Sequence, residues 1–421
     1  HVFHAHISQG LTMIEFFQAF YERPDFWFLA AIPFVASFVG WFTNWIAIKM
    51  TFWPLEFIGF KPLLLGWQGI IPSKAGKMAA IVVDNSLSKL ASLSELFQEM
   101  EPEKIAEQIS YSITSRIEEY VDEIMTERNA VLWENLPLMV KNRIYARARR
   151  QIPEIMDNVV DDMAQNIEQL IDLKTMVVRM MVADKSLVVR IFKEVGDKEL
   201  KFVVNSGAYF GFLFGLIQLA VYSYYPANWV LPFFGFIVGW ATNWLALNVI
   251  FRPIDPIKVG PFVIHGLFMK RKAEVADKFS EISTIEIVNL QNMMIEVMTG
   301  PRSYRTKAII KKHLRPLLDS GVVRTAIQIS IGAEGFADLK NLVADRAVDM
   351  SLGSMSEQGF SRERSTIIHR IFSRRMVAMS NEEFQELLRP AFKEDEWILI
   401  LLGAVLGAMA GFGQLAIILN L

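Results

Sequence analysis

The chain has 421 residues, of which 52% are hydrophobic and 21% charged, and its 43 Lys and Arg nearly balance its 45 Asp and Glu. This balance lacks the basic footprint of a nucleic-acid-binding protein, and the absence of cysteine excludes disulfides, thiol catalysis and thiolate metal sites. Because so many charges accompany so hydrophobic a composition, the charges must be segregated. All lysines and arginines except Arg23 and Lys49 lie within 51–201 and 252–396.

Residues 1–25 precede the first apolar run. The first twelve are typical of a tag or of upstream-translated sequence, so their histidines predict no metal site, and Met13 is the expected native start. Residues 13–25 predict a short amphipathic lead-in. The apolar run that follows lacks the basic region and the small-residue cleavage site of a secretory signal. The histidines are His1, His4 and His6.

Four apolar runs are long enough to cross the roughly 30 Å of hydrocarbon in a bilayer. They predict transmembrane helices at 26–50, 202–222, 229–251 and 397–421. Buried helices of a soluble protein are the weaker alternative, because that alternative would have to hold at four separate places. Tryptophans stand where interfacial aromatic residues are expected. These are Trp27, Trp229 and Trp397.

The charges that flank these runs predict the orientation of the chain. Basic residues precede 202–222, follow 229–251 and precede 397–421, whereas the turn at 223–228 carries no charge. Positive charge near membrane ends stays cytoplasmic. Both long polar segments, 51–201 and 252–396, are therefore expected in the cytoplasm, with both termini outside.

Two stretches of sequence occur twice. One reads Gly-Trp-x-Thr-Asn-Trp at 40–45 and 239–244, and a proline follows nine residues after the second tryptophan in both copies. The other has three glycines spaced four apart and a glutamine, at 207–218 and 403–414, an offset of 196 residues. Each unit of about 195 residues crosses the membrane twice, which predicts parallel tandem repeats rather than the inverted repeats of many transporters.

The polar segments are expected to be mostly helical. Apolar residues recur at intervals of three and four over 103–128 and 151–195, and 303–349 behaves similarly. Residues 353–359 are expected to form a loop, and 55–71 and 254–268 either hairpins or interfacial segments. Pro102, Pro137 and Pro153 are expected to mark breaks. The predicted fold class is an all-α membrane protein with four transmembrane helices in two parallel tandem repeats, each with a large, mostly helical cytoplasmic segment.

These motifs resemble the bacterial membrane-protein family called domain of unknown function 445. The resemblance rests on Gly-Trp-x-Thr-Asn-Trp with its proline, on a Gly-Ile-Ile-Pro turn before a basic helix, and on the closing Gly/Gln run, and it spans residues 26–421. The second copy of the turn has Met269 where Pro72 stands in the first. The resemblance implies a protein of the bacterial inner membrane, without an assigned activity and without catalytic residues to carry over.

Polar and glycine residues inside the predicted helices are the candidate site residues. Glycines four apart share one helix face and let a neighbouring helix approach closely, so tight packing is favoured over a pore lining. The amides need partners in hydrocarbon. Pairing between the glutamines and the Thr-Asn residues is the expected hydrogen-bonded contact, and a polar binding or permeation site is the alternative. The candidates are Thr43, Asn44, Trp45, Thr242, Asn243, Trp244, Gln218, Gln414, Gly207, Gly211, Gly215, Gly403, Gly407 and Gly411.

Basic clusters in the polar segments are interpreted either as solvated surface or as contacts to lipid headgroups. The headgroup candidates are Lys270, Arg271, Lys272, Arg374 and Arg375. Scattered histidines and the absence of known catalytic motifs predict no enzyme, no metal and no cofactor.

The favoured hypothesis is a non-enzymatic membrane protein whose cytoplasmic helical segments bind lipid or a partner, with a Met- and Val-rich face over 176–189 as a lipid groove. Protein partners and self-association stay open, and nucleic acid is not expected. The alternative is a channel or secondary transporter with a path at the interface of the two repeats.

Overall fold

A computed structural model describes residues 21, 26–60, 65–319, 335, 338–350, 358–393 and 396–419. The predicted leader, with its histidines and Met13, lies outside the described residues except for Tyr21. The same is true of most of the predicted loop at 353–359. Helices dominate the described chain, which divides into two compact units. We call residues 1–74, 192–271 and 381–421 the membrane unit, and residues 75–191 and 272–380 the helical unit.

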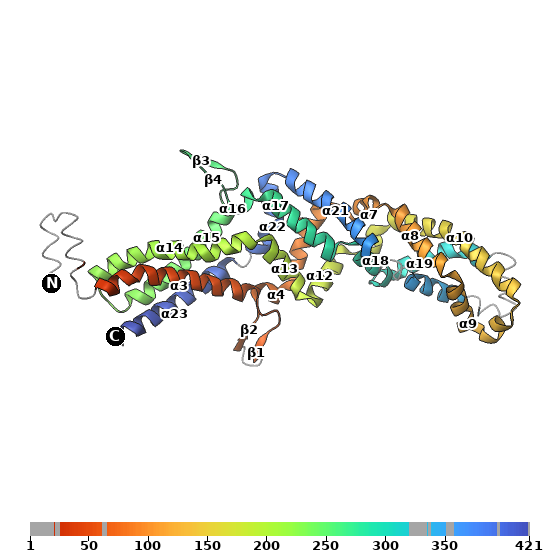
Figure 1. The fold of residues 1–421 in the computed structure, drawn as a ribbon, viewed down its shortest axis with the longest axis horizontal. Helices are drawn as coiled ribbons and strands as arrows, with labels where there is room; N and C mark the ends of the chain where they lie inside the picture. The colour runs from red at the N-terminus through yellow and green to blue at the C-terminus, as the bar shows by residue number, and fades with distance from the viewer. Residues whose placement is uncertain are drawn as a thin grey trace. The chain divides into compact units, whose positions relative to one another are not determined.

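Four long helices form the core of the membrane unit (Figure 1). They are α3 (Phe26–Phe52), α14 (Asp197–Tyr224), α15 (Val230–Phe251) and α23 (Glu396–Leu419). Among the described residues, these are the helices long and apolar enough to cross a membrane. The main contacts join α3 to α14 and α15 to α23, and α14 also packs against α15.

The helix α14 begins five residues before the predicted start at 202. Its first turn carries Asp197 and Glu199. Acidic side chains are stabilising there, because they interact favourably with the positive end of the helix dipole. The apolar run alone therefore underestimates the length of this helix.

Two β-hairpins and several short helices complete the membrane unit. Strands β1 (Ile58–Phe60) and β2 (Leu65–Trp67) pair antiparallel, as do β3 (Ile257–Val259) and β4 (Phe262–Ile264). Segments 55–71 and 254–268 were expected to be either hairpins or interfacial segments, and both contain a hairpin. The hairpins lead into α4 (Ile70–Ser73) and α16 (Leu267–Lys270), and α22 (Asn381–Lys393) precedes α23.

The helical unit is built from both predicted polar segments. The helix α10 packs against α8 and α19, α5 against α12, and α17 against α21. Residues 75–191 and 272–380 therefore share one compact unit instead of forming a separate body in each predicted repeat. The first segment supplies α5 (Ala75–Val82), η3 (Val83–Leu87), α6 (Ser88–Leu90), α7 (Leu93–Glu99), α8 (Pro102–Ser115), α9 (Ile117–Asn135), α10 (Leu138–Gln165), α11 (Ile167–Leu170), α12 (Leu173–Ala183) and the start of α13 (Lys185–Val195). The second supplies α17 (Lys272–Ile282), η4 (Ser283–Ile287), α18 (Leu290–Thr299), α19 (Ser303–Leu318), the helical residues 338–350 and α21 (Gln358–Ala378).

Local capping explains several of these helix starts. Ser92 Oγ accepts from the Glu95 amide at 3.1 Å before α7, and Asp172 Oδ1 accepts from the Thr175 amide at 3.1 Å before α12. Such caps satisfy amides that have no partner within the helix. Pro102 opens α8, where its missing N–H is not needed.

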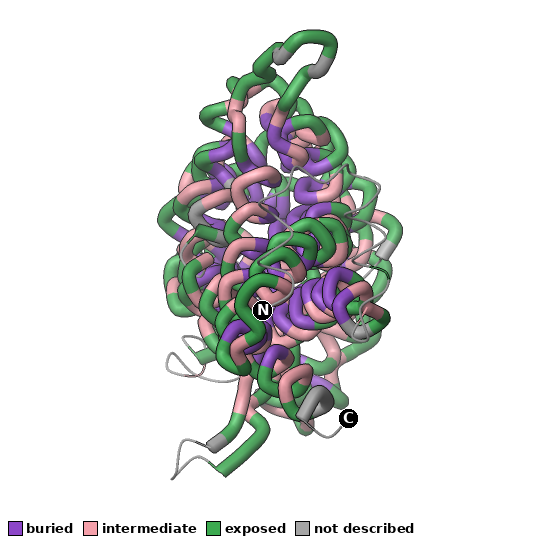
Figure 2. The backbone as a smooth tube through the Cα atoms, turned by 90° about the vertical axis from the view of Figure 1, so that its left-hand side faces the viewer, coloured by how far each residue is buried: buried purple, intermediate pink, exposed green. Residues whose placement is uncertain are grey.

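The Met- and Val-rich face over 176–189 is largely packed in the protein core. Met176, Val177 and Met181 in α12 are at most 1% exposed, and Val188 in α13 is fully buried. Val182 alone among the predicted groove residues is strongly exposed. Along the helices, buried sides alternate with exposed ones (Figure 2). Most of the predicted lipid groove is therefore an interior face, and lipid binding at these residues stays a prediction.

Candidate functional site

Asn44 and Asn243 each join two of the long helices. Asn44 Nδ2 donates to the main-chain carbonyl of Val203 at 2.8 Å, and Asn243 Nδ2 donates to that of Leu399 at 2.8 Å. Both side chains are buried. An unsatisfied polar group in hydrocarbon costs several kcal/mol, so these bonds hold α3 against α14 and α15 against α23.

Glycines allow the helices to approach closely enough for these bonds. A Cβ atom at Gly207 would lie 2.3 Å from the carbonyl oxygen of Gly40 and 2.7 Å from Asn44 Nδ2. At Gly403 it would lie 2.2 Å from Asn243 Nδ2. A larger residue would push the helices apart. The other predicted glycines make similar contacts: Gly211 with Ala36, Gly215 with Pro33, Gly407 with Gly235, and Gly411 with Leu231.

The remaining residues of the repeated motif do not bond across the helix pairs. The hydroxyls of Thr43 and Thr242 donate to the carbonyls three residues earlier, at 3.2 Å and 3.4 Å. Trp45 and Trp244 lie on exposed faces and stack on the tryptophans one turn before them. The ammonium of Lys49 lies 4.6 Å from the centre of the Trp45 ring, a cation–π contact.

The predicted pairing of the glutamines with the Thr-Asn residues is wrong. The helices α3 and α14 run antiparallel, since Gly215 lies against Pro33 while Gly207 lies against Gly40. Gln218 is therefore at the opposite end of this interface from Asn44. Gln218 is 2% exposed, and its Nε2 has no hydrogen-bond partner among the described residues. Gln414, at the matching position of α23, is half-buried.

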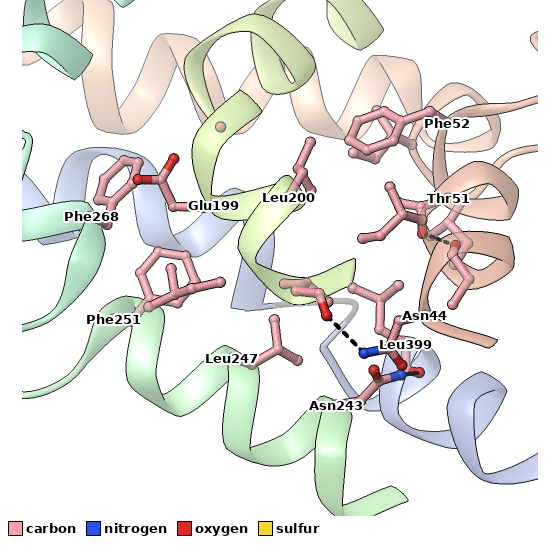
Figure 3. A pocket seen from close by; sticks show the side chains of 17 residues that line it. Asn44, Thr51, Phe52, Glu199, Leu200, Asn243, Leu247, Phe251, Phe268 and Leu399 are labelled. Atoms are coloured by element: carbon pink, nitrogen blue, oxygen red, sulfur yellow. Dashed lines mark hydrogen bonds between the residues drawn. The ribbon is translucent and has the colours of Figure 1, made fainter. Parts of the chain in front are cut away.

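A cavity of about 60 Å³ lies among the four long helices, near the ends of α3 and α15 and the start of α14 (Figure 3). We call it the interface cavity. Its polar side chains are Asn44, Thr51, Glu199 and Asn243. The rest of the lining is Ala47, Ile48, Phe52, Ile70, Ile71, Gly196, Leu200, Val203, Leu247, Ile250, Phe251, Phe268 and Leu399.

Each of the two asparagines leaves one atom without a partner. A main-chain carbonyl can only accept, so the amide nitrogens must face Val203 and Leu399. The Oδ1 atoms of Asn44 and Asn243 are buried and have no hydrogen-bond partner among the described residues. Figure 3 shows both amides in the wall of the interface cavity. This cavity therefore has two unpaired hydrogen-bond acceptors from two different helices.

The carboxylate of Glu199 is already paired. Arg271 Nη1 lies 2.6 Å from both of its oxygens, and the side chains are 7% and 18% exposed. Burying one such charge without the other is strongly unfavourable. Arg271, one of the predicted headgroup residues, neutralises a buried acid of the membrane unit.

The other predicted headgroup residues divide into engaged and exposed ones. Arg375 pairs with Glu95, and Lys272 donates to the main-chain carbonyl of Met379. Lys270 and Arg374 are exposed. Contact between any of these residues and lipid stays a prediction.

A second cavity, of about 130 Å³, lies in the helical unit. We call it the helical-unit cavity. Tyr120 and Arg147 are the lining residues with polar side chains, and Arg147 Nε is buried with no hydrogen-bond partner among the described residues. Two other buried atoms nearby in sequence, Thr114 Oγ1 and Gln151 Oε1, also have no such partner. The apolar lining is Ile113, Ile117, Val121, Ile124, Met125, Ile144, Ala148, Ile152, Met156, Leu314, Leu317, Leu318, Leu339, Val343, Ala347 and Met350.

A hydrogen-bonded cluster holds α9 against α10 beside this cavity. Asp122 Oδ1 accepts from Trp133 Nε1 at 2.9 Å and from the Tyr145 hydroxyl. Burial, and then the hydrogen bond to Asp122, raise the pKa of Tyr145 well above its ordinary value. The phenol therefore stays protonated and acts as a donor in this cluster.

A charged cluster joins α10 to α19, which also line the helical-unit cavity. Lys312 Nζ lies 2.7 Å from Asp162 Oδ2, and His313 Nε2 lies 3.0 Å from the same oxygen. The hydrogen bond from Lys312, followed by that from His313, lowers the pKa of Asp162. Within the described part of the chain, no three His, Asp or Glu side chains are grouped so that they could hold a metal ion.

Comparison of the chain with protein-family models, with curated proteins and with solved structures finds no match in any of the three. The resemblance to domain of unknown function 445 therefore stays a prediction from the sequence.

Proposed function

We propose that this chain is a non-enzymatic integral membrane protein whose helical unit binds a membrane lipid. The observation that carries the proposal is the helical-unit cavity, which combines apolar walls with the unpaired Nε of Arg147. An apolar cavity with a few convergent polar groups is the usual form of a small-molecule site. The ligand expected from this chemistry is a lipid with an acidic group at Arg147 and a short part of one acyl chain in the cavity.

The size and lining of the cavity favour hydrocarbon over water. Its volume of about 130 Å³ is close to that of an engineered cavity of about 150 Å³ that stays dry and admits benzene. Each methylene moved from water into such a site gains about 0.8 kcal/mol. A chain that comes from the bilayer gains little, because the bilayer is equally apolar. The acyl chain therefore fills the cavity without adding much affinity. Selectivity between lipids must come from the polar end of the ligand.

Arg147 supplies that selectivity. A buried N–H without a partner costs about 1–3 kcal/mol, and a ligand that accepts its hydrogen bond recovers this cost. Carboxylate and phosphate oxygens form the strongest hydrogen bonds with a guanidinium group. An acidic lipid is therefore favoured over a neutral one.

We also propose the membrane arrangement expected from the sequence. Two tandem repeats cross a bacterial inner membrane in parallel, and the helical unit lies in the cytoplasm with both termini outside. The repeat is supported by the equivalent bonds of Asn44 and Asn243 and by the matching contacts of Gly207 and Gly403. Exposed Lys270 and Arg374 are the residues proposed to contact headgroups.

Binding of radiolabelled palmitic acid to the purified full-length protein in a non-ionic detergent tests the lipid site. Ala148→Leu fills the cavity, and Ala146→Leu adds the same bulk to an exposed position of α10. We expect Ala148→Leu to weaken binding at least tenfold, equivalent to about 1.4 kcal/mol, and Ala146→Leu to leave it unchanged. Equal binding by both variants would show that palmitate binds elsewhere.

A second pair of variants tests the role of the Arg147 charge. Arg147→Met keeps most of the side-chain length but removes the donor, and Arg150→Met makes the same change at an exposed position. We expect Arg147→Met to lower affinity for palmitate while affinity for the uncharged methyl ester is retained. A parallel loss for acid and ester would contradict the assigned role of Arg147.

A further inference from the structure

Two hydrogen-bond acceptors in the interface cavity of the membrane unit have no partner. Asn44 Nδ2, Asn243 Nδ2 and the Thr51 hydroxyl each donate one hydrogen bond to a main-chain carbonyl. Glu199 contributes only acceptor oxygens, and these pair with Arg271. The Oδ1 atoms of both asparagines are left over.

These two oxygens are costly to leave unpaired. Asn44 is 0% exposed and Asn243 is 3% exposed, so bulk water does not reach them freely. A buried acceptor without a partner costs about 1–3 kcal/mol, and two such atoms line the same small space. A ligand with at least two donor hydrogens would satisfy both at once.

The volume limits the size of that ligand. About 60 Å³ corresponds to roughly two water molecules, whose share of liquid volume is about 30 Å³ each. A group of one or two heavy atoms fits, and a whole headgroup does not. Around the asparagines the walls are Ile, Leu, Val and Phe side chains, which favour an apolar substituent on the ligand.

The two unpaired oxygens favour a positively charged donor over a neutral one, because they are the negative ends of two amide dipoles. Glu199 also lines the cavity, but Arg271 already neutralises its carboxylate, so the amide dipoles supply the attraction. No lining residue of the interface cavity is a lysine, arginine or histidine. An ammonium group offers three N–H donors and a positive charge, whereas water offers two donors and no charge.

We propose that the interface cavity is a binding site for a small primary ammonium ion, whose N–H groups donate to Oδ1 of Asn44 and of Asn243. The two helix pairs, α3 with α14 and α15 with α23, each contribute one acceptor, so the site exists only where both pairs meet. This site is independent of the proposed lipid site, which lies in the other compact unit and uses an unpaired donor instead of unpaired acceptors.

Thermal unfolding of the purified full-length protein in detergent tests this site, with methylammonium chloride as the probe. Tetramethylammonium chloride at equal concentration is the control, because it has the same charge but no N–H group. We expect methylammonium to raise the unfolding temperature in a saturable manner and tetramethylammonium to leave it unchanged. An equal response to both salts would overturn the proposal and leave water as the occupant of the cavity.

Variants then locate the binding. Ala47→Leu fills the cavity and leaves both asparagines in place, and Ala31→Leu makes the same change on the exposed face of α3. We expect Ala31→Leu to respond to methylammonium like the wild type and Ala47→Leu not to respond. A full response from Ala47→Leu would place the binding outside the interface cavity and refute the assignment.

A second pair keeps the test valid if Ala47→Leu does not fold. Asn243→Leu removes one acceptor, and Asn248→Leu removes an amide on the same helix that does not line the interface cavity. We expect the midpoint concentration of methylammonium to rise about tenfold in Asn243→Leu, equivalent to 1.4 kcal/mol, and to stay the same in Asn248→Leu. An unchanged midpoint in Asn243→Leu would contradict the role of its oxygen.

Discussion

Gly207→Ala should destabilise the membrane unit although it adds a single methyl group. The new Cβ atom would lie 2.3 Å from the carbonyl oxygen of Gly40, whereas ordinary contacts begin near 3.4 Å. The two backbones must therefore separate by about an ångström at this point, because neither a carbonyl nor a helix backbone can rotate away. The same atom would lie 2.7 Å from Asn44 Nδ2 and would disturb its bond to Val203.

The size of the effect follows from these two contacts. Inserting a methyl group into a packed interface costs about 1–3 kcal/mol. Losing one inter-helix hydrogen bond in a membrane protein adds on average about 0.6 kcal/mol. We therefore expect Gly207→Ala to lower the free energy of unfolding by about 2–4 kcal/mol relative to a Gly→Ala change that meets no neighbour, the sum of the two terms with allowance for their spread.

Unfolding by sodium dodecyl sulfate in mixed micelles, followed by far-ultraviolet circular dichroism, measures this change. Gly413→Ala is the control, since a Cβ at this position of α23 has no neighbour within 4 Å. Alanine favours a helix over glycine by about 1 kcal/mol, so the control should be neutral or slightly stabilised. A Gly207→Ala protein as stable as the control would refute the close approach of α3 and α14.

Three further predictions concern charged and hydrogen-bonded groups. Glu199→Gln should lower the free energy of unfolding by about 3–5 kcal/mol, because it leaves Arg271 buried without its partner. Adding Arg271→Met should recover part of this loss in the same unfolding assay. Losses that simply add in the double variant would argue against the ion pair. Because the folded pKa of Asp162 is lowered, its contribution to stability is present above its unfolded pKa of about 3.9 and is lost as pH falls through the lower folded value. The unfolding temperature of the wild type should therefore fall more steeply than that of Asp162→Asn over this acidic range, and parallel curves would contradict the ion pairs. Tyr145→Phe should lower stability by about 1.5–3 kcal/mol, the usual worth of a hydrogen bond to a charged group, here Asp122, and an unchanged melting curve would show that this bond is not needed.

The sequence predicted the long helices well because their signal is local. An apolar run either is or is not long enough to cross a bilayer, and each of the four predicted runs is a helix in the structure. Helix ends were less accurate where polar residues extend the helix, as Asp197 does in α14. Pro153 was expected to mark a break and instead lies inside α10, while Pro102 and Pro137 do stand at helix starts.

The partners of the polar residues could not be predicted, because they depend on how antiparallel helices align. Asn44 was expected to meet a glutamine, but its partner is the main-chain carbonyl of Val203, which has no signature in the sequence. The burial of the Met- and Val-rich face could not be predicted for a related reason, since periodicity identifies an apolar face but not the helix that covers it.

The helical-unit cavity was missed altogether, although one signal for it exists. Arg147 interrupts the apolar face that Ile144, Ala148 and Ile152 form on α10. A single charge on an otherwise apolar helix face indicates a buried charge that needs a partner. The elements that close the cavity from the far part of the chain, α19 and residues 338–350, could not be assigned to it from local sequence.

The helical unit is built from two segments of the chain that α14 and α15 separate in sequence. The two segments are therefore synthesised at different times. A ribosome delivers 75–191 well before 272–380, so the apolar sides of α8, α9 and α10 emerge before Leu314, Leu317 and Leu318 of α19 exist to cover them. During that interval the nascent chain exposes the surface that later encloses the cavity. Completion of the helical unit must therefore wait until α14 and α15 have been synthesised.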